Sequence, residues 1–343
     1  MPRFVPGLDL ARAFYEDVIR DIVGEVEHSA ALLGSGSDVL DFDTERSTDH
    51  GWGPRIQLFV AGQEQAAELA PRIDAGLPEE FRGWPTRYGW DDVPVGHHIH
   101  LGPLGPWLEE KLGFDPRNRM NARDWLTTPQ QLLLEVTGGA VFHDGLCELE
   151  RLRRALEWYP HDVWLWLLAC QWRRIDQEEP FVGRTAEVGD ELGSRVLAAR
   201  LARDLMRLCF LFERRYAPYS KWFGSAFAQL DAAADVGPPL EAAIAATDGA
   251  SREDVLVEAM QRVGERHNDL GLTERAQPTV RPFHGRPFRV LGSGRFVDAC
   301  AARISDPWLR SLPLVGSIDQ LSDSTDVLSN PAVARRAAAL YDV

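Results

Sequence analysis

The hydrophobic positions in the N-terminal part of the chain change their spacing from helical to alternating. Apolar side chains recur at every fourth position, at Leu10, Phe14, Val18 and Ile22, which indicates an amphipathic helix. Short apolar runs bounded by glycine indicate strands. The expected elements are a helix at 8–23, strands at 29–33 and 55–60, a helix at 63–73, a long loop at 75–92 and a strand at 96–101. The run at 132–136 fits a strand or a helix.

From residue 145 onward the apolar spacing is helical. Leu146, Leu149, Leu152 and Leu156 form one stripe of an amphipathic helix. Further helices are expected at 163–175, 197–212, 239–246, 252–269 and 295–304. The sequence therefore predicts an α+β protein, with a small mixed β-sheet in an α/β domain at residues 1–144 and an all-α helical bundle at residues 145–343.

Composition narrows the possible partners and the cellular compartment. The net charge of −15 over 343 residues argues against general binding to nucleic acid or to an acidic membrane surface. We expect a small-molecule partner, and the oligomeric state stays open. Apolar runs are too short for a membrane span, and no signal peptide is recognisable. The four cysteines, Cys147, Cys170, Cys209 and Cys300, are predicted to be buried thiols of a cytoplasmic protein.

The stretch GSGSDVLDFDTERSTDHGWGPR, residues 34–55, concentrates polar chemistry between the first two expected strands. A nucleotidyl transfer site needs a backbone turn, usually formed by glycine, that allows a triphosphate to approach closely. It also needs carboxylates on the next strand that hold divalent metal ions. Gly36 and Ser37 have the residue types for the turn, and Asp49 is expected to begin the second strand as a metal ligand.

These motifs resemble the nucleotidyltransferase superfamily, and most closely a bacterial family within it that is described only as a domain of unknown function. The resemblance rests on GSGSDVL, FDTERSTDH, WGPR, FHDGL, WYPHDVW, QEEPFVGR, EVGDELGSR and YSKW, and spans about residues 30–330. It implies an architecture like that of kanamycin nucleotidyltransferase, with ATP as donor, magnesium as cofactor, and transfer of AMP to a hydroxyl or amine of a small-molecule or protein acceptor.

The resemblance also implies roles for residues of the helical domain. Tyr219, Ser220 and Lys221 correspond to side chains that contact the β- and γ-phosphates in the superfamily, and a lysine suits phosphate as a point charge. Glu178 is a candidate general base for the acceptor, because a helical-domain glutamate has this role in aminoglycoside nucleotidyltransferases. The alternative to phosphate contact is that residues 219–221 form a solvated turn. The alternative to catalysis is that Glu178 has only a capping or linker role between two helices.

The chain differs from the family at the strand whose carboxylates would hold the metal ions. The family has Asp-His-Asp where this chain has Asp49-His50-Gly51, so the second carboxylate is missing, and the third position offers His98 or His100. Three hypotheses follow. The protein transfers AMP with Asp49 and a nearby acid, or it catalyses a metal-independent reaction on a small metabolite with His50 or His100 as base, or it binds nucleotides or partners without turnover.

Two further glycine-containing segments are polar enough to be candidate ligand-binding segments. Gly292-Ser293-Gly294 follows an apolar pair and resembles a small phosphate loop, although it lacks the flanking signature of one. The segment 316–326, GSIDQLSDSTD, also recurs in the family, and the sequence assigns it no chemistry.

Overall fold

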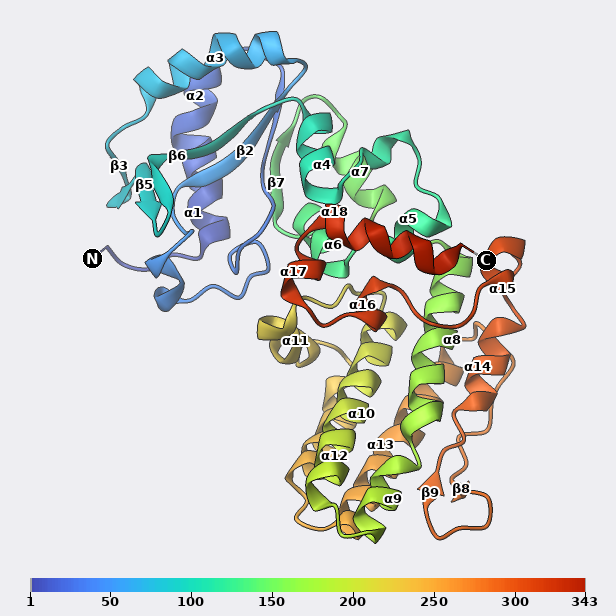
Figure 1. Cartoon of the computed structure of the whole chain (residues 1–343). Helices are drawn as coiled ribbons and strands as arrows, with labels where there is room; N and C mark the ends of the chain where they lie inside the picture. Colours follow the sequence, from blue (N-terminus) through green and yellow to red (C-terminus); the bar gives the residue numbers. More distant parts are fainter. Residues whose placement is uncertain (1, 343) are drawn as a thin grey trace. The chain divides into compact units, whose positions relative to one another are not determined.

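The computed structural model describes residues 2–342, which form two compact units with an α+β fold (Figure 1). The first unit comprises Met1–Met120, Thr128–Glu157 and Ser329–Arg335, and the second comprises Asn121–Thr127, Trp158–Leu328 and Arg336–Val343. The predicted boundary between residues 144 and 145 stays a prediction.

A mixed five-stranded sheet in the order β5-β6-β2-β1-β7 organises the first unit. Its strands are β1 (His28–Leu32), β2 (Arg55–Val60), β5 (Arg87–Trp90), β6 (Val93–Gly102) and β7 (Ala140–Asp144). Strand β1 is antiparallel to β2 and β7, whereas β2 runs parallel to β6 with Arg55 opposite His98 and Gln57 opposite His100. A separate pair is β3 (Glu80–Phe81) with β4 (Trp84–Pro85).

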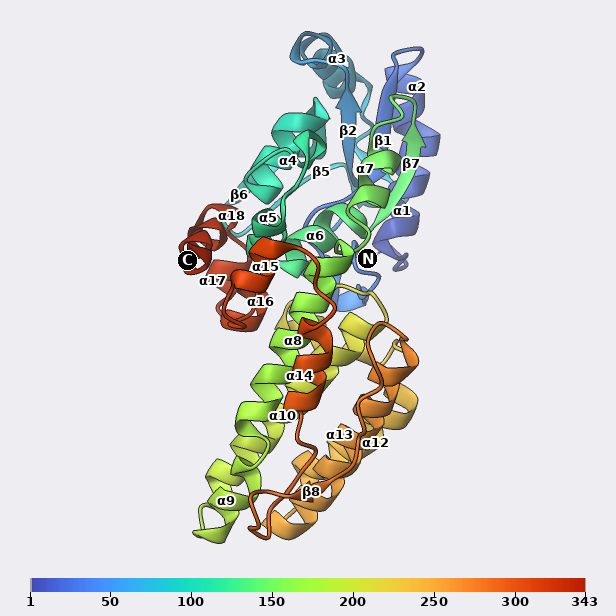
Figure 2. The ribbon, with the colours of Figure 1, turned by 90° about the vertical axis from the view of Figure 1, so that its right-hand side faces the viewer.

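One face of the sheet is apolar and covered by the N-terminal helices and α3. The helical elements of this unit are α1 (Gly7–Phe14), the π-helix η1 (Tyr15–Ile19), α2 (Arg20–Val23), the 3-10 helix η2 (Glu45–Asp49), α3 (Gln63–Gly76), α4 (Leu104–Leu112), η3 (Pro116–Asn118), α6 (Gln130–Thr137), α7 (Leu149–Ala155) and α18 (Pro331–Ala334). Leu10, Phe14, Ile56 and Leu58 belong to one buried cluster on this face. Figure 2 shows α1 and α2 on one side of the strands and α4 on the other.

The opposite face of the sheet carries polar side chains. Because side chains alternate along a strand, Arg55 and Gln57 point away from the cluster that contains Ile56 and Leu58. The Gln57 side-chain oxygen accepts a hydrogen bond from the backbone N–H of Leu33, at 2.6 Å. This face therefore places polar groups of β2 beside the end of β1.

Several sequence predictions need correction. Residues 75–92 are not one loop, because they contain β3, β4 and β5. Strands β3 and β4 pair with each other through Phe81 and Trp84, and β5 pairs with the following strand β6 through Arg87 and His97. The run 132–136 lies in helix α6, and β7 was not predicted. Asp49 ends the helix η2 rather than beginning a strand, since β2 starts six positions later at Arg55. Cys147 is exposed, and the other three thiols are buried.

The second unit is mainly helical, as the periodicity predicted. Its elements are α5 (Ala122–Thr127), α8 (His161–Glu178), α9 (Phe181–Glu187), α10 (Glu191–Phe212), α11 (Ser220–Phe227), α12 (Ala233–Ala245), α13 (Gly249–Asp269), β8 (Arg281–Pro282), β9 (Arg289–Val290), α14 (Gly294–Ala301), α15 (Pro307–Ser311), α16 (Ile318–Leu321) and α17 (Thr325–Leu328), and η4 spans Arg335–Tyr341. Helices α8, α10, α12 and α13 lie side by side in Figures 1 and 2. Within the described residues, none of the helices has the length and apolar character to cross a membrane.

Candidate functional site

The turn that follows β1 depends on glycine at two positions. Gly34 has a φ of +90° and Gly36 a φ of +142°, both in the region that L-residues rarely adopt. A Cβ atom at Gly36 would lie 2.2 Å from Asp38 Oδ1 and 2.5 Å from Arg55 Nη2. The turn therefore brings its backbone into close contact with a guanidinium, while Ser35 is exposed and Ser37 half-buried.

A buried ion pair ties this turn to β2. The guanidinium of Arg55 donates from Nε to Asp38 Oδ2 at 3.0 Å, from Nη2 to Asp38 Oδ1 at 2.7 Å and from Nη2 to the Ser35 carbonyl at 2.9 Å. Burial disfavours the charged guanidinium, but Asp38 more than offsets this, so the pKa of Arg55 is raised. The pair fixes the shape of the turn and holds a guanidinium, balanced by one carboxylate, beside it.

A hollow of about 170 Å³ lies in the same unit, between residues 48–54 and the segment from Trp84 to Trp90. Its lining includes Trp52, Trp84, Tyr88 and Trp90, so much of its wall is aromatic. The Trp84 indole N–H and the Tyr88 hydroxyl are buried and have no hydrogen-bond partner within residues 2–342. The hollow has room for a flat ring rather than for a whole nucleotide.

Tyr88 connects the hollow with the turn. Its ring lines the hollow, and its hydroxyl is close enough to Arg55 and Asp38 for both charges to affect its pKa, which burial raises. A Cβ atom at Gly53 would lie 2.7 Å from the Tyr88 ring, so glycine is needed there too. The hollow and the turn of residues 34–37 are thus neighbours within one unit.

Asp49 and His50 line the same hollow. Asp49 Oδ1 lies 2.8 Å from His50 Nδ1, and both side chains are more than 60% exposed, at 62% and 63%. The nearby Asp43 carboxylate accepts instead from the Gly7 N–H at 2.7 Å and from the Trp52 indole at 2.8 Å. At the hollow, the Asp49 carboxylate is therefore paired with the His50 imidazole, whereas Asp43 is engaged elsewhere.

The donor set around Asp49 does not fit a divalent metal. Magnesium requires several oxygen ligands in octahedral geometry, and Gly51, two positions after Asp49, has no side-chain oxygen to offer. Among residues 2–342, no three side chains of His, Cys, Asp or Glu are grouped so that they could hold a metal ion. The predicted metal role of Asp49 stays a prediction.

The two candidate histidines of β6 have different surroundings. His98 Nε2 lies 2.8 Å from the Tyr88 carbonyl, and its ring centroid is 4.8 Å from that of Trp90, so His98 supports the wall of the hollow. The Nε2 atom of His100 is buried without a partner in the described chain, and burial lowers its pKa. His100 therefore favours the neutral form, and its predicted role as a base stays untested.

The candidate residues of the helical domain belong to the second unit. Glu178 ends α8 and forms an ion pair with Arg200 of α10, with Oε2 3.1 Å from Nε. Tyr219 precedes α11, and Ser220 and Lys221 form its exposed first turn, with the Lys221 ammonium 4.9 Å from the Trp222 ring centroid. Their predicted contacts with a nucleotide stay predictions.

The predicted phosphate loop at residues 292–294 already binds a carboxylate of the protein. Leu291, Gly292 and Ser293 donate their backbone N–H groups to Glu179 at 2.9, 3.2 and 3.0 Å, and Gly294 donates to Asp176 at 2.8 Å. The loop has the anion-binding geometry that glycines suggest, but its anions are internal. We therefore reject it as a phosphate site.

Sequence reasoning missed Asp38, Arg55, Tyr88 and Trp90. One signal was available, because an arginine at the start of an otherwise apolar strand and an acid inside the apolar DVL run suggest a buried pair. The aromatic wall gave no such signal, since it depends on the pairing of β5 with β6.

Comparison with known proteins gives one match. Residues 125–223 match the family described as "Domain of unknown function (DUF4037)", which is less than a third of the 343 residues. No curated protein and no solved structure matches the chain.

Proposed function

We propose that the first unit binds a nucleoside triphosphate and transfers a nucleoside monophosphate, with AMP from ATP the best candidate, to a hydroxyl or amine of an acceptor. This is nucleotidyltransferase chemistry at a site with an altered metal position. The observation that carries the proposal is the glycine-dependent turn of residues 34–37, which lies beside the Arg55 guanidinium and borders the aromatic hollow through Tyr88.

The turn supplies phosphate-binding groups. Ser35 and Ser37 have hydroxyls for phosphate oxygens, and the positive φ of Gly36 allows close approach of backbone. Arg55 adds a fixed positive charge without ordering cost, because Asp38 already holds it in place. Charge on the leaving pyrophosphate would be stabilised here.

The hollow suits the nucleobase. Trp84, Tyr88 and Trp90 present aromatic surface to a space of about 170 Å³, and a base stacked on such a ring gains about 1–3 kcal/mol. The unpartnered Trp84 N–H could donate to a ring nitrogen of the base, which would satisfy a buried polar group.

Asp49 and His50 would accept the proton of the acceptor. With Nδ1–H directed at Asp49, the Nε2 atom of His50 is the free acceptor. The acceptor oxygen or nitrogen forms a bond to the α-phosphorus, and the bond to the bridging oxygen breaks. Pyrophosphate leaves with that electron pair, and the proton moves to His50. No step is assigned to a metal ion.

The same pair supports a second candidate, which is metal-independent catalysis on a small metabolite. An Asp–His pair functions as a base without a cation, and it lines a hollow that a metabolite ring can enter. The two candidates differ in whether ATP binds at this site.

Calorimetric titration of ATP into the wild type and a Trp90→Leu variant tests the proposal. Loss of the stacking surface should weaken ATP binding about tenfold or more, given the energy of base stacking. Trp308→Leu is the matched control, because Trp308 is a partly exposed tryptophan of the second unit. Equal affinities of the two variants, or a wild type that does not bind ATP, would refute the proposal.

A further inference from the structure

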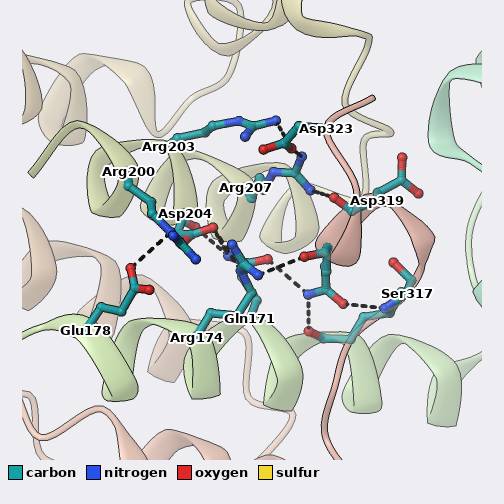
Figure 3. Close-up of polar contacts among 12 residues, drawn as sticks. Gln171, Arg174, Glu178, Arg200, Arg203, Asp204, Arg207, Ser317, Asp319 and Asp323 are labelled. Carbon is teal, nitrogen blue, oxygen red and sulfur yellow. Dashed lines mark hydrogen bonds and ion pairs between the residues drawn. The ribbon is translucent and has the colours of Figure 1, made fainter. Parts of the chain in front are cut away.

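Arginines line one side of α10 in the second unit, as Figure 3 shows. Arg200, Arg203 and Arg207 are spaced by three and four residues, which places them on one helical face, and α8 adds Arg174. All four guanidiniums make polar contacts with acids or carbonyls of the same unit. These contacts differ in whether each guanidinium has a carboxylate of its own.

Arg174 and Arg200 each have a carboxylate of their own. Arg200 pairs with Glu178 at 3.1 Å, and Arg174 lies 3.2 Å from Asp204 Oδ1 and donates to the Gln320 carbonyl at 2.8 Å. Asp204 is only 3% exposed, and its Oδ1 also accepts from Gln171 at 2.9 Å. The contacts of Asp204 therefore belong to the packed interior of the helical unit, whereas the Arg200 side chain is 54% exposed.

Arg203 and Arg207 instead share one carboxylate oxygen. Asp323 Oδ1 lies 2.5 Å from Nη2 of Arg203 and 3.6 Å from Nη2 of Arg207 (Figure 3). The Arg207 side chain is 14% exposed, whereas that of Asp323 is 67% exposed. A buried cation is therefore closed off by an acid that remains accessible to water.

The positive charge of Arg207 is not fully compensated by the carboxylates around it. Burial and the neighbouring Arg203 lower its pKa, and the acids nearby, Asp319, Asp204 and Asp323, do not offset this. Its other nitrogen, Nη1, donates to the Asp319 carbonyl, which is a dipole rather than a charge. An anion that reached both guanidiniums directly would stabilise this pair more than one shared oxygen does.

The contacts that anchor the segment before Asp323 do not involve the Asp323 carboxylate. Helix α16 is held by Gln320, whose amide donates to the Leu167 carbonyl and to Gln171 Oε1, both at 3.0 Å. Asp323 lies between the end of α16 at Leu321 and the start of α17 at Thr325. Rotation of this residue is therefore separate from the anchoring of α16.

We propose that Arg203 and Arg207 form a binding site for a small phosphate-bearing anion, and that Asp323 occupies this site until the anion displaces it. The phosphate oxygens accept from both guanidiniums, which present several donors in fixed geometry. The acid thus lowers the apparent affinity for the anion by competing for the same donors. The polar segment 316–326 gains a role as the part of the chain that closes the site.

Calorimetry with inorganic pyrophosphate at constant ionic strength tests this proposal. Asp323→Asn removes the competitor and should bind pyrophosphate about tenfold more tightly than the wild type, in line with the strength of charge-assisted hydrogen bonds. Asp326→Asn is the matched control, because it removes the same charge from an exposed residue three positions later. It should leave the affinity unchanged.

The paired substitution Arg203→Gln with Arg207→Gln, made in the Asp323→Asn background, should abolish the gain. Circular dichroism and the unfolding midpoint verify that the helical unit remains folded in each variant. Retained tight binding after both arginines are replaced would place pyrophosphate elsewhere, including the turn of the first unit, and would overturn the proposal. Equal affinity of Asp323→Asn and Asp326→Asn would overturn it as well.

Discussion

Two aspartates of the stretch 34–55 have opposite environments, although both stand beside a basic side chain. Asp38 is buried and holds Arg55 through two hydrogen bonds, while Asp49 is exposed and contacts His50. A buried pair that loses one partner leaves an uncompensated charge in the interior, whereas an exposed pair contributes little. Asp38 therefore maintains the architecture of the turn, and under the proposed function Asp49 takes part in the chemistry.

Substitutions at these aspartates should separate the two roles. Asp38→Asn should lower the free energy of unfolding by about 3 kcal/mol, because Arg55 would stay buried without its carboxylate. Asp49→Asn should change it by less than about 0.5 kcal/mol. Urea denaturation measures both values. Similar losses in the two variants would show that our assignment of the roles is wrong.

Glu179 joins the end of α8 to the loop before α14. Its carboxylate accepts three backbone N–H groups, which favour the charged form, yet burial has the larger effect and raises its pKa to about 7. A carboxyl with a raised pKa in the folded state stabilises the protein below its ordinary pKa. That stability is lost as the pH rises towards 7.

Glu179→Gln provides the test of this linkage. The free energy of unfolding of the wild type minus that of the variant should fall steadily between pH 5 and pH 8, because only the wild type must ionise a buried group. Other titrating groups are common to both proteins and cancel in the difference. Urea denaturation at several pH values gives the quantity, and a difference that is constant or rises with pH would contradict the explanation.

The sequence predicted those elements whose pattern is local. Helices α8 and α10 and strands β1 and β2 follow from spacing within each segment. Strand β7 pairs with β1, which lies far earlier in the sequence, so no local pattern could indicate it. Strand β5 forms a local hairpin with β6, but the glycine, proline, arginine and aromatic residues of this segment are typical of a loop. The prediction that Asp49 begins a strand was wrong because the capping residue Thr44 starts the helical turn η2, in which Asp49 is the last residue.

The candidate site, like the fold, could be predicted from the sequence only where its residues lie close together in the chain. Gly36, Ser37, Asp49 and His50 could be nominated from the sequence because residue type and order within one stretch were sufficient, and their roles stay predictions. The hollow was not, since its aromatic wall is assembled from β4, β5 and the loop before β2. Partners that come from separate elements need the fold before they can be identified.

The net charge of the chain, −15, contrasts with the positively charged side chains at both proposed sites. A negative protein repels polyanions at long range, so anion binding depends on local guanidiniums such as Arg55 in the first unit and Arg207 in the second. This arrangement favours small phosphate-bearing ligands over nucleic acid.

ATP titrations of Gly51→Asp and Gly51→Asn, each with magnesium and with chelator, test whether the first unit has a nucleotidyltransferase site. Gly51 has a φ of +62°, which Asp and Asn tolerate, and a Cβ there meets Trp90 at 3.8 Å. If the first unit has a nucleotidyltransferase site that lost its second carboxylate, magnesium should tighten ATP binding to Gly51→Asp about tenfold or more. It should have no such effect on Gly51→Asn or the wild type. No gain in Gly51→Asp, or an equal gain in Gly51→Asn, would contradict the account.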